Sequence, residues 1–434
     1  MFDTATLNWK ERTYDPDRSM GKTMKKTDWA ALCKFAADLR GGVSCEALGN
    51  TTNGLNNMAR LLRFTDGVLW VARIAMRAST ADTVKLRSEV DTMRWIREQS
   101  SLPVPEIFAS ECEIGEHNTV GAPFVLMSFV PGNTAMDAGG GYETHHGIIP
   151  AAHRAQFYRA VAACHVQMTS LRLPKIGTVR RTPEGTFEAG PIPGIGGPFE
   201  TATAFYEAWI NHVHFPRRPD EILEIMRGAP ESEQVLRAVE RFPSRLPAVA
   251  SQLARRAGHN SDRGPFPLCH PDFLHSNIII AGDTDFDVLA VIDWEGAYTL
   301  PLELVRFPRF LDLMPRRFGR PGRFGANGLP CDDDEQQTWH ERHEYVRTVA
   351  ALEQEAGSDG TLSACLADEH AQSLSYAMDA FDGGKMGFYD QLLDDLEAAS
   401  LHDRELPQGH RQEEEEEGEE DDDDDKQRGG VGKP

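Results

Sequence analysis

Three polar side chains in the second half of the chain have the types and spacing of a metal site. Asp272 and Asn277 lie in the stretch LCHPDFLHSNIII, and Asp293 follows in VIDWE. Two apolar runs around the polar residues 283–287 predict a small hairpin between them. Such a hairpin brings the loop before its first strand close to Asp293, which follows its second strand. Two carboxylates and a carboxamide oxygen are hard ligands that suit Mg²⁺, which indicates phosphoryl transfer.

The elements around these residues change in type along the chain. The first half has short β-tending runs and one helical stretch, Asp82–Gln99, whereas the second half is mostly helical by its apolar spacing. The segment 177–199 is too rich in Gly and Pro for regular structure. These patterns predict an α+β fold with a small β-rich lobe and a larger helical lobe. The strand-like runs are 43–49, 57–64, 68–76, 106–112 and 124–130; the other predicted helices are 151–171, 201–214, 231–257, 334–356, 362–381 and 386–400.

The paired motifs His270-x-Asp272-x-x-x-x-Asn277 and Ile292-Asp293-Trp294-Glu295 resemble those of the aminoglycoside phosphotransferase family, relatives of the protein kinases and choline kinases. The resemblance runs from about residue 41 to about residue 315. It implies a bilobal protein-kinase-like fold with a nucleotide between the lobes. The units expected are an amino-terminal extension with a helix (1–40), an N-lobe with a hinge (41–132), a helical C-lobe (133–407) and a disordered acidic tail (408–434).

The resemblance also implies roles for the polar residues. Asp272 matches the catalytic aspartate that orients or accepts the proton of a substrate hydroxyl. Asn277 and Asp293 match the magnesium ligands, while His270 is expected to brace the loop. The implied reaction transfers the γ-phosphoryl of ATP or GTP to the hydroxyl of an unknown small molecule.

The N-lobe provides a candidate ion pair for the nucleotide phosphates. Arg73 stands where the family has a basic residue on the third strand. Glu89 lies on the apolar face of its helix with Leu86 and Met93, so the carboxylate is expected to be buried. Because buried carboxylates need partners, Arg73 is the predicted one. Arginine is broader than lysine and prefers forked contacts, so the exchange is not neutral.

Two further N-lobe segments are candidates for nucleotide contacts. The loop Leu48–Met58 contains Gly49 and Gly54, which allow unusual backbone angles and exposed N–H groups over the phosphates. The stretch 124–132 resembles the family's hinge, where backbone groups of Met127 and Phe129 are expected to bind the base.

Two other interpretations remain open. His270, Asp272 and His275 could form a transition-metal site, since two histidines and a carboxylate can bind zinc or iron. The chain could also be a pseudokinase, in which altered lobe contacts leave nucleotide binding or protein interaction as the function. Intact Asp272, Asn277 and Asp293 favour an active kinase, whereas Arg73 favours a pseudokinase.

Composition narrows the class of protein. The formal net charge is −23, and it is −11 without the twelve acidic residues between Glu413 and Asp425. This balance argues against nucleic-acid binding and against a basic membrane-contact face. The start has no apolar signal region, and the seven cysteines form no C-x-x-C pair. We therefore expect a cytoplasmic protein with reduced thiols; its oligomeric state is open.

Overall fold

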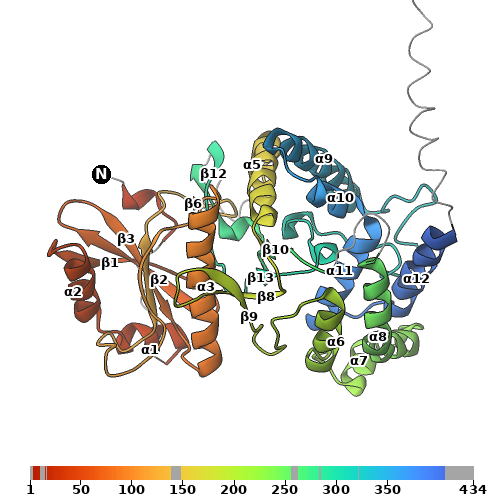
Figure 1. Ribbon diagram of the computed structural model, residues 1–434, viewed down its shortest axis with the longest axis horizontal. Helices are drawn as coiled ribbons and strands as arrows, with labels where there is room; N and C mark the ends of the chain where they lie inside the picture. The colour runs from red at the N-terminus through yellow and green to blue at the C-terminus, as the bar shows by residue number, and fades with distance from the viewer. Residues whose placement is uncertain are drawn as a thin grey trace, which may run out of the picture.

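The architecture is described from a computed structural model, shown in Figure 1. The described residues are 3–9, 15, 17–137, 148–255, 262–282, 285–320 and 322–405. A β-rich lobe is followed along the chain by a larger, mainly helical lobe, so the predicted fold class is confirmed. The predicted acidic tail, 408–434, lies outside the described residues.

The β-rich lobe is built on one antiparallel sheet of five strands. Its strand order is β1-β2-β3-β5-β4, and β2 and β3 pair without interruption from Asn57 opposite Ala75 to Arg63 opposite Leu69. All five predicted strands are present. Their bounds are β1 Cys45–Asn53, β2 Asn57–Phe64, β3 Leu69–Ala75, β4 Ile107–Glu111 and β5 Phe124–Ser128.

Helices cover both faces of this sheet. The helices α1 (Ser19–Lys26) and α2 (Trp29–Leu39) pack on one face, where buried Leu32 joins a cluster with the sheet residue Leu62. The helix α3 (Thr80–Gln99) contributes Leu86 to a cluster on the other face, and its start is fixed by a capping box between Ser79 and Asp82. The sheet is thus held rigidly between helical layers.

The second lobe contains small sheets among its helices. The strand β6 pairs with β11, and β11 with β12, directly after the connection between the lobes. The elements are β6 Asn133–Thr134, α5 Ala151–Ser170, β7 Arg172–Leu173, β8 Gly177–Arg181, β9 Phe187–Gly190, α6 Ala202–His212, α7 Pro219–Ile225, α8 Ser232–Leu253, β10 Phe266–Cys269, η2 His275–Asn277, β11 Ile278–Gly282, β12 Asp285–Val291, β13 Tyr298–Thr299, η3 Leu302–Leu304, η4 Arg309–Leu311, α9 Asp333–Ala356, α10 Thr361–Ala367, α11 Glu369–Asp382 and α12 Tyr389–Glu405.

Two predictions about this lobe are wrong. The expected single helix over 362–381 is two helices, because the Asp368 carboxylate accepts hydrogen bonds from the backbone N–H groups of His370 and Ala371 and starts a new helix. The segment 177–199, predicted to lack regular structure, contains the β8–β9 hairpin. Its glycines serve strand pairing here, because a Cβ on Gly177 would clash with the backbone opposite.

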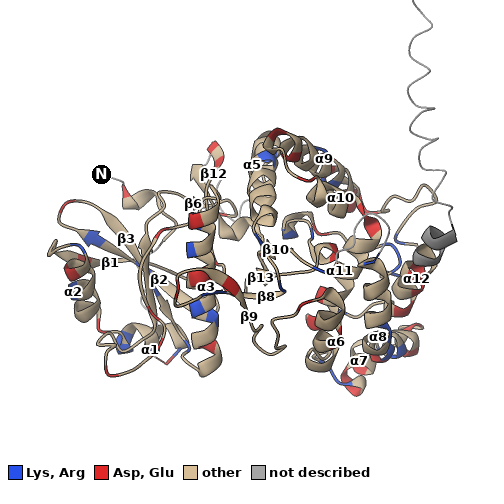
Figure 2. Cartoon of the chain, viewed as in Figure 1, with Lys and Arg blue, Asp and Glu red and all other residues tan. Residues whose placement is uncertain are grey.

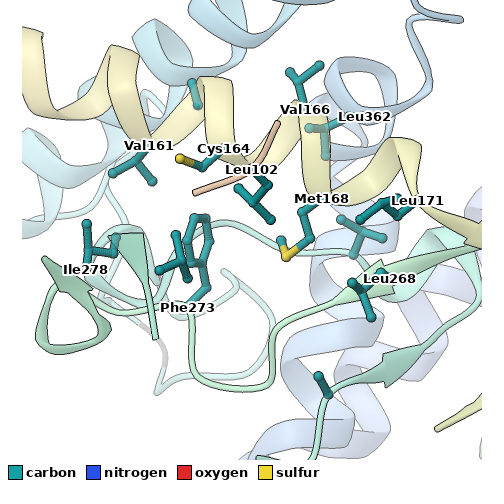
Figure 3. Close-up of a cluster of buried hydrophobic side chains, with 14 of the residues drawn as sticks. Leu102, Val161, Cys164, Val166, Met168, Leu171, Leu268, Phe273, Ile278 and Leu362 are labelled. Atoms are coloured by element: carbon teal, nitrogen blue, oxygen red, sulfur yellow. The ribbon is translucent and has the colours of Figure 1, made fainter. Parts of the chain in front are cut away.

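The helix α5 forms the roof of the loop that carries Asp272. Figure 3 shows Val161, Cys164 and Met168 of α5 above Phe273 and Ile278, which come from the loop and the start of β11. Phe273 is almost fully buried. The residue after Asp272 is therefore anchored in the core beneath α5, which fixes the position of the loop.

Charged side chains of both signs are spread over both lobes, as Figure 2 shows. Within the described residues, no helix has the length and apolar character needed to cross a membrane. All seven cysteines are free thiols.

Candidate active site

His270 braces the loop through both nitrogens of its ring. Its Nε2 lies 3.0 Å from the carbonyl oxygen of Ile292, and its Nδ1 lies 3.1 Å from the backbone N–H of Asp272, which donates to it. Burial lowers the pKa of His270, which keeps the ring neutral, so Nε2 carries the proton. Because both nitrogens are engaged, His270 is not available as a ligand in the alternative transition-metal site.

Asp272 is held by two side chains and remains half exposed. The Asn277 amide nitrogen donates to the Asp272 carbonyl oxygen at 2.9 Å and approaches Oδ2 at 3.4 Å. The guanidinium Nε of Arg309 lies 3.2 Å from Oδ1 of Asp272. With 53% of its side chain exposed, this carboxylate can still meet a substrate.

Asp293 is brought to the same place by the β11–β12 hairpin. The Ile292 N–H donates to the Asn277 carbonyl oxygen at 2.9 Å, one residue before Asp293. Asp293 has φ +63°, and within the described ranges it is the one non-glycine residue with positive φ. The next residue, Trp294, is fully buried and anchors the turn. Asp272, Asn277 and Asp293 thus lie on adjoining, hydrogen-bonded backbone.

The donor set at this position is oxygen-based. The side-chain nitrogen of Asn277 donates to Asp272, so the side-chain oxygen of Asn277 points away from that contact. The Asp293 carboxylate is half exposed. No group of three or more His, Cys, Asp or Glu side chains is arranged around a possible metal position in the part of the chain that the structure describes. An oxygen-ligated ion that keeps several waters, such as Mg²⁺, suits this set.

Arg73 connects the two lobes. Its guanidinium pairs with Glu89 through Nη1 and with Asp293 through Nη2 at 2.7 Å. The ion pair expected between Arg73 and Glu89 is therefore present, whereas the contact with Asp293 was not foreseen. Burial raises the pKa of Glu89 to about 7 in spite of the adjacent cation.

Glu295 forms a second connection that the sequence analysis missed. The side-chain amides of Asn56 and Asn57 donate to its two carboxylate oxygens at 3.0 and 2.9 Å. These asparagines lie at the β1–β2 turn, more than two hundred residues away in sequence. The glutamate belongs to the IDWE motif, but nothing local pointed to its partners.

The β1–β2 segment differs from the predicted phosphate loop. Strand β1 continues to Asn53, so only residues 54–56 remain as a loop, and Gly49 lies inside the strand where its register shifts. Neither Gly49 nor Gly54 is among the glycines with positive φ. The two glycines therefore do not use the left-handed backbone that they allow, and their contact with the nucleotide stays a prediction.

The predicted hinge residues lie at and just beyond the end of β5. Met127 is buried and lies between Val71 of β3 and Ile107 of β4 in the sheet, while Phe129 is the first residue beyond β5. Ser128 fixes this segment, since its hydroxyl accepts a hydrogen bond from the Glu106 N–H at 2.9 Å. Whether these positions contact a base stays a prediction.

A cavity of about 330 Å³ adjoins the Asp272 loop. Its wall includes Pro271, Phe273 and several aromatic side chains. Arg309 spans from Asp272 to Asp379 of α11, which it meets at 3.0 Å, and Asp379 also pairs with Arg306. No local pattern indicates this chain of charges, because it depends on how η4 and α11 pack.

The chain is similar to known proteins in sequence and in fold, and three of these proteins are described here. A subtelomeric hrmA-associated cluster protein of Aspergillus fumigatus is 25% identical over 370 residues, which are 71% of this chain and 68% of that protein. The structure of the macrolide 2′-phosphotransferase MphH from Brachybacterium faecium has a TM-score of 0.39 and 14% identity, covering 87% of this chain and 98% of that one. For an aminoglycoside phosphotransferase from Alicyclobacillus acidocaldarius these values are 0.31, 13%, 90% and 98%.

The segment that matches the family covers most of the site residues but not Arg309. The model described as the phosphotransferase enzyme family matches residues 53–302, more than half of the chain. The matched segment contains Arg73, Glu89, Asp272, Asn277 and Asp293. The chain therefore belongs to the phosphotransferase enzyme family.

Proposed function

We propose that the protein is a small-molecule kinase that transfers the γ-phosphoryl of ATP or GTP to a hydroxyl group. The observation that carries the proposal is the joining of Asp272, Asn277 and Asp293 by backbone and side-chain hydrogen bonds at the edge of a cavity. A base and two oxygen ligands at one point are what phosphoryl transfer needs.

Asp272 is proposed as the group that receives the acceptor's proton. Its Oδ1 faces Arg309 and its Oδ2 faces the Asn277 amide, so the carboxylate is oriented before a substrate arrives. As the acceptor oxygen bonds to the γ-phosphorus, the bond to the nucleoside diphosphate breaks and the hydroxyl proton passes to Asp272. Arg309 is a positioning residue in this scheme, because it acts through Asp272.

Asn277 and Asp293 would hold the magnesium ion. When bound, Mg²⁺ neutralises charge on the phosphate oxygens. Arg73 stands beside this position with a cation that Asp293 and Glu89 already share. A nucleotide phosphate would complete its contacts, which is the role proposed for Arg73 in place of lysine.

The cavity of about 330 Å³ is the proposed acceptor site. Phe205, Trp209 and Tyr298 line it, and so do the carboxylates of Asp379 and Asp382. Aromatic walls suit an acceptor with an apolar body, and few polar groups would orient it. The acceptor hydroxyl would reach Asp272 past Pro271.

One observation favours the second candidate, a pseudokinase. The Arg73 guanidinium contacts Asp293, so it occupies a carboxylate that the metal needs. A magnesium-dependent assay of nucleotide hydrolysis, run with ATP and GTP on the parent and on Asp272→Asn, separates the two. A kinase shows slow hydrolysis that the substitution abolishes. Nucleotide binding without turnover in either protein, also after a screen of alcohols, supports the pseudokinase.

A further inference from the structure

The amino-terminal residues 6–9 are hydrogen-bonded to both lobes. The backbone N–H of Asn8 donates to the side-chain oxygen of Asn133 at 2.9 Å, and the Asn133 amide donates back to the Thr6 carbonyl oxygen at 3.0 Å. These two bonds grip the chain on both sides of Leu7. Asn133 belongs to β6, the first strand after the lobe connection. One end of the segment is therefore attached to the helical lobe.

The same segment is also attached to the β-rich lobe. The Asn50 side chain donates to the carbonyl oxygen of Trp9 at 3.4 Å, from strand β1. The Asn8 amide meanwhile donates to the Asp137 carbonyl oxygen at 3.1 Å. We call residues 3–9 the strap, because hydrogen bonds hold them to both lobes.

Leu7 of the strap is buried against the sheet of the β-rich lobe. Its side chain is 8% exposed and belongs to one apolar cluster with Val71 and Met127. Val71 is two residues before Arg73 on β3, so both point to the same face of the sheet. Arg73 reaches Asp293 of the other lobe, so this face is the cleft face. Leu7 is thus buried on the hinge side of the phosphate-gripping residue.

This is the position that a nucleotide base would need. A base between the lobes lies on the hinge side of its phosphates, against apolar sheet residues. A leucine buried there from a distant part of the chain leaves less room for that base. Packing an apolar side chain against Val71 and Met127 is favourable on its own, so the strap is expected to stay seated without nucleotide.

We propose that the strap is an intramolecular ligand of the base end of the nucleotide site, and that a purine nucleotide binds only by displacing Leu7. This inference rests on the proposed nucleotide site. If the strap is seated in about nine molecules of ten, the apparent affinity for nucleotide is about tenfold weaker than that of the open site. The strap then sets the nucleotide concentration at which the enzyme works.

The test compares Leu7→Ser with the parent as full-length proteins. Calorimetry with the magnesium complexes of ATP and GTP should show affinity about tenfold higher in Leu7→Ser. Ile225→Ser is the matched control, since Ile225 is an exposed apolar residue on α7, away from the cleft. It should leave the affinity unchanged.

A second ligand separates the base position from the phosphate position. Tripolyphosphate with Mg²⁺ has the phosphates but no base, so its affinity should be the same in Leu7→Ser and the parent. An equal gain for tripolyphosphate and nucleotide would contradict occupation of the base position. Unchanged or weaker nucleotide binding in Leu7→Ser would make Leu7 a structural part of the pocket and refute the proposal.

Hydrogen exchange gives a readout without any substitution. The Asn8 N–H is bonded to Asn133 in the seated strap, so nucleotide should accelerate exchange in residues 3–9. Unchanged or slower exchange in saturating nucleotide would count against displacement. If no nucleotide binds to the parent or to Leu7→Ser, the proposed function fails; if both bind equally, only the strap inference fails.

Discussion

The loop that carries Asp272 and the part of the β-rich lobe that carries Arg73 are built in different ways. In the loop, His270, Asp272 and Asn277 are fixed by hydrogen bonds to neighbours within about twenty residues, and Phe273 anchors them in the core. On the other side, Arg73 and the β1–β2 turn depend on Asp293 and Glu295, more than two hundred residues away.

The two halves of the site therefore respond differently to changes elsewhere in the protein. A loop supported by its own backbone keeps its geometry when distant parts vary. The contacts of Arg73 and of the β1–β2 turn join residues of both lobes, so they exist only while the lobes are together and are lost when the lobes separate. Arg73, which stands in place of the expected lysine, lies in the half that is assembled from a distance.

The largest effect is expected in the locally built half. Asp272→Asn keeps the loop's shape but removes the base, so turnover on an established acceptor should fall by roughly a hundredfold or more. Nucleotide affinity should barely change. Asp287→Asn, an exposed carboxylate on β12, is the control in steady-state assays. Retained turnover in Asp272→Asn would remove the proposed base from the mechanism.

Asp293→Ala tests the residue shared by the two halves. The substitution removes a proposed magnesium ligand and one of the partners of Arg73. Calorimetry should show that Mg²⁺ no longer strengthens nucleotide binding, while the thermal midpoint stays close to that of the parent. Asp287→Ala should keep the magnesium effect. Equal magnesium dependence in Asp293→Ala and in the parent would contradict the proposal that Asp293 binds Mg²⁺.

Arg309→Gln tests whether the loop also needs support from η4 and α11. The guanidinium holds Asp272 and Asp379, so its loss should lower kcat by about tenfold, the size of one charged hydrogen bond. Arg309→Lys should recover part of it, and Arg317→Gln, an exposed arginine on another contact, should have no effect. A change confined to the thermal midpoint would show a structural role only.

Glu89→Gln tests the Arg73–Glu89 pair through the pH dependence of stability. Burial raises the pKa of Glu89 from 4.5 to about 7, so its contribution to stability is present below pH 4.5 and is lost as the pH rises through 7. Glutamine does not ionise. Denaturant titrations should therefore show the parent losing stability relative to Glu89→Gln between pH 4.5 and 7, by at most about 3 kcal/mol. A pH-independent difference would mean that Arg73 keeps Glu89 ionised throughout.

The smallest effect is expected from the acidic tail. Neither half of the site is predicted to depend on residues 408–434, which have almost no apolar groups to bury. Deleting them should move the thermal midpoint by no more than about 2 °C in calorimetric scans. A larger drop would show that the tail docks on the folded protein.

Much of the fold could be predicted because its signals are local. The five strands of the first sheet and the helix at Asp82–Gln99 appear close to their predicted bounds, since alternation and helical spacing are properties of short windows. The predicted helix bounds were wrong where a single side chain determines where a helix begins. Asp368 does this, and it divides one apolar pattern into two helices. The prediction also failed at residues 177–199, where glycine permits close strand pairing instead of preventing structure.

The site divides in the same way. The loop motifs and the buried Glu89 could be identified from spacing, because both lie on short, regular segments. Glu295's asparagine partners and the contacts of Arg309 could not, since pairs so distant in sequence are defined only by tertiary packing. The same reason hid the placement of Leu7 beside Val71.

The hydrogen bonds from Asn56 and Asn57 to Glu295 hold the two lobes together. They fasten a hairpin tip to the polypeptide just after Asp293, and both must break before the lobes separate. Both bonds have a charged acceptor, which makes them stronger than hydrogen bonds between neutral groups. In the proposed kinase, release of the nucleoside diphosphate would require this opening, and in such enzymes lid opening rather than bond-making often governs the steady-state rate. Solvent viscosity, which slows opening but not chemistry, is expected to slow this enzyme's cycle.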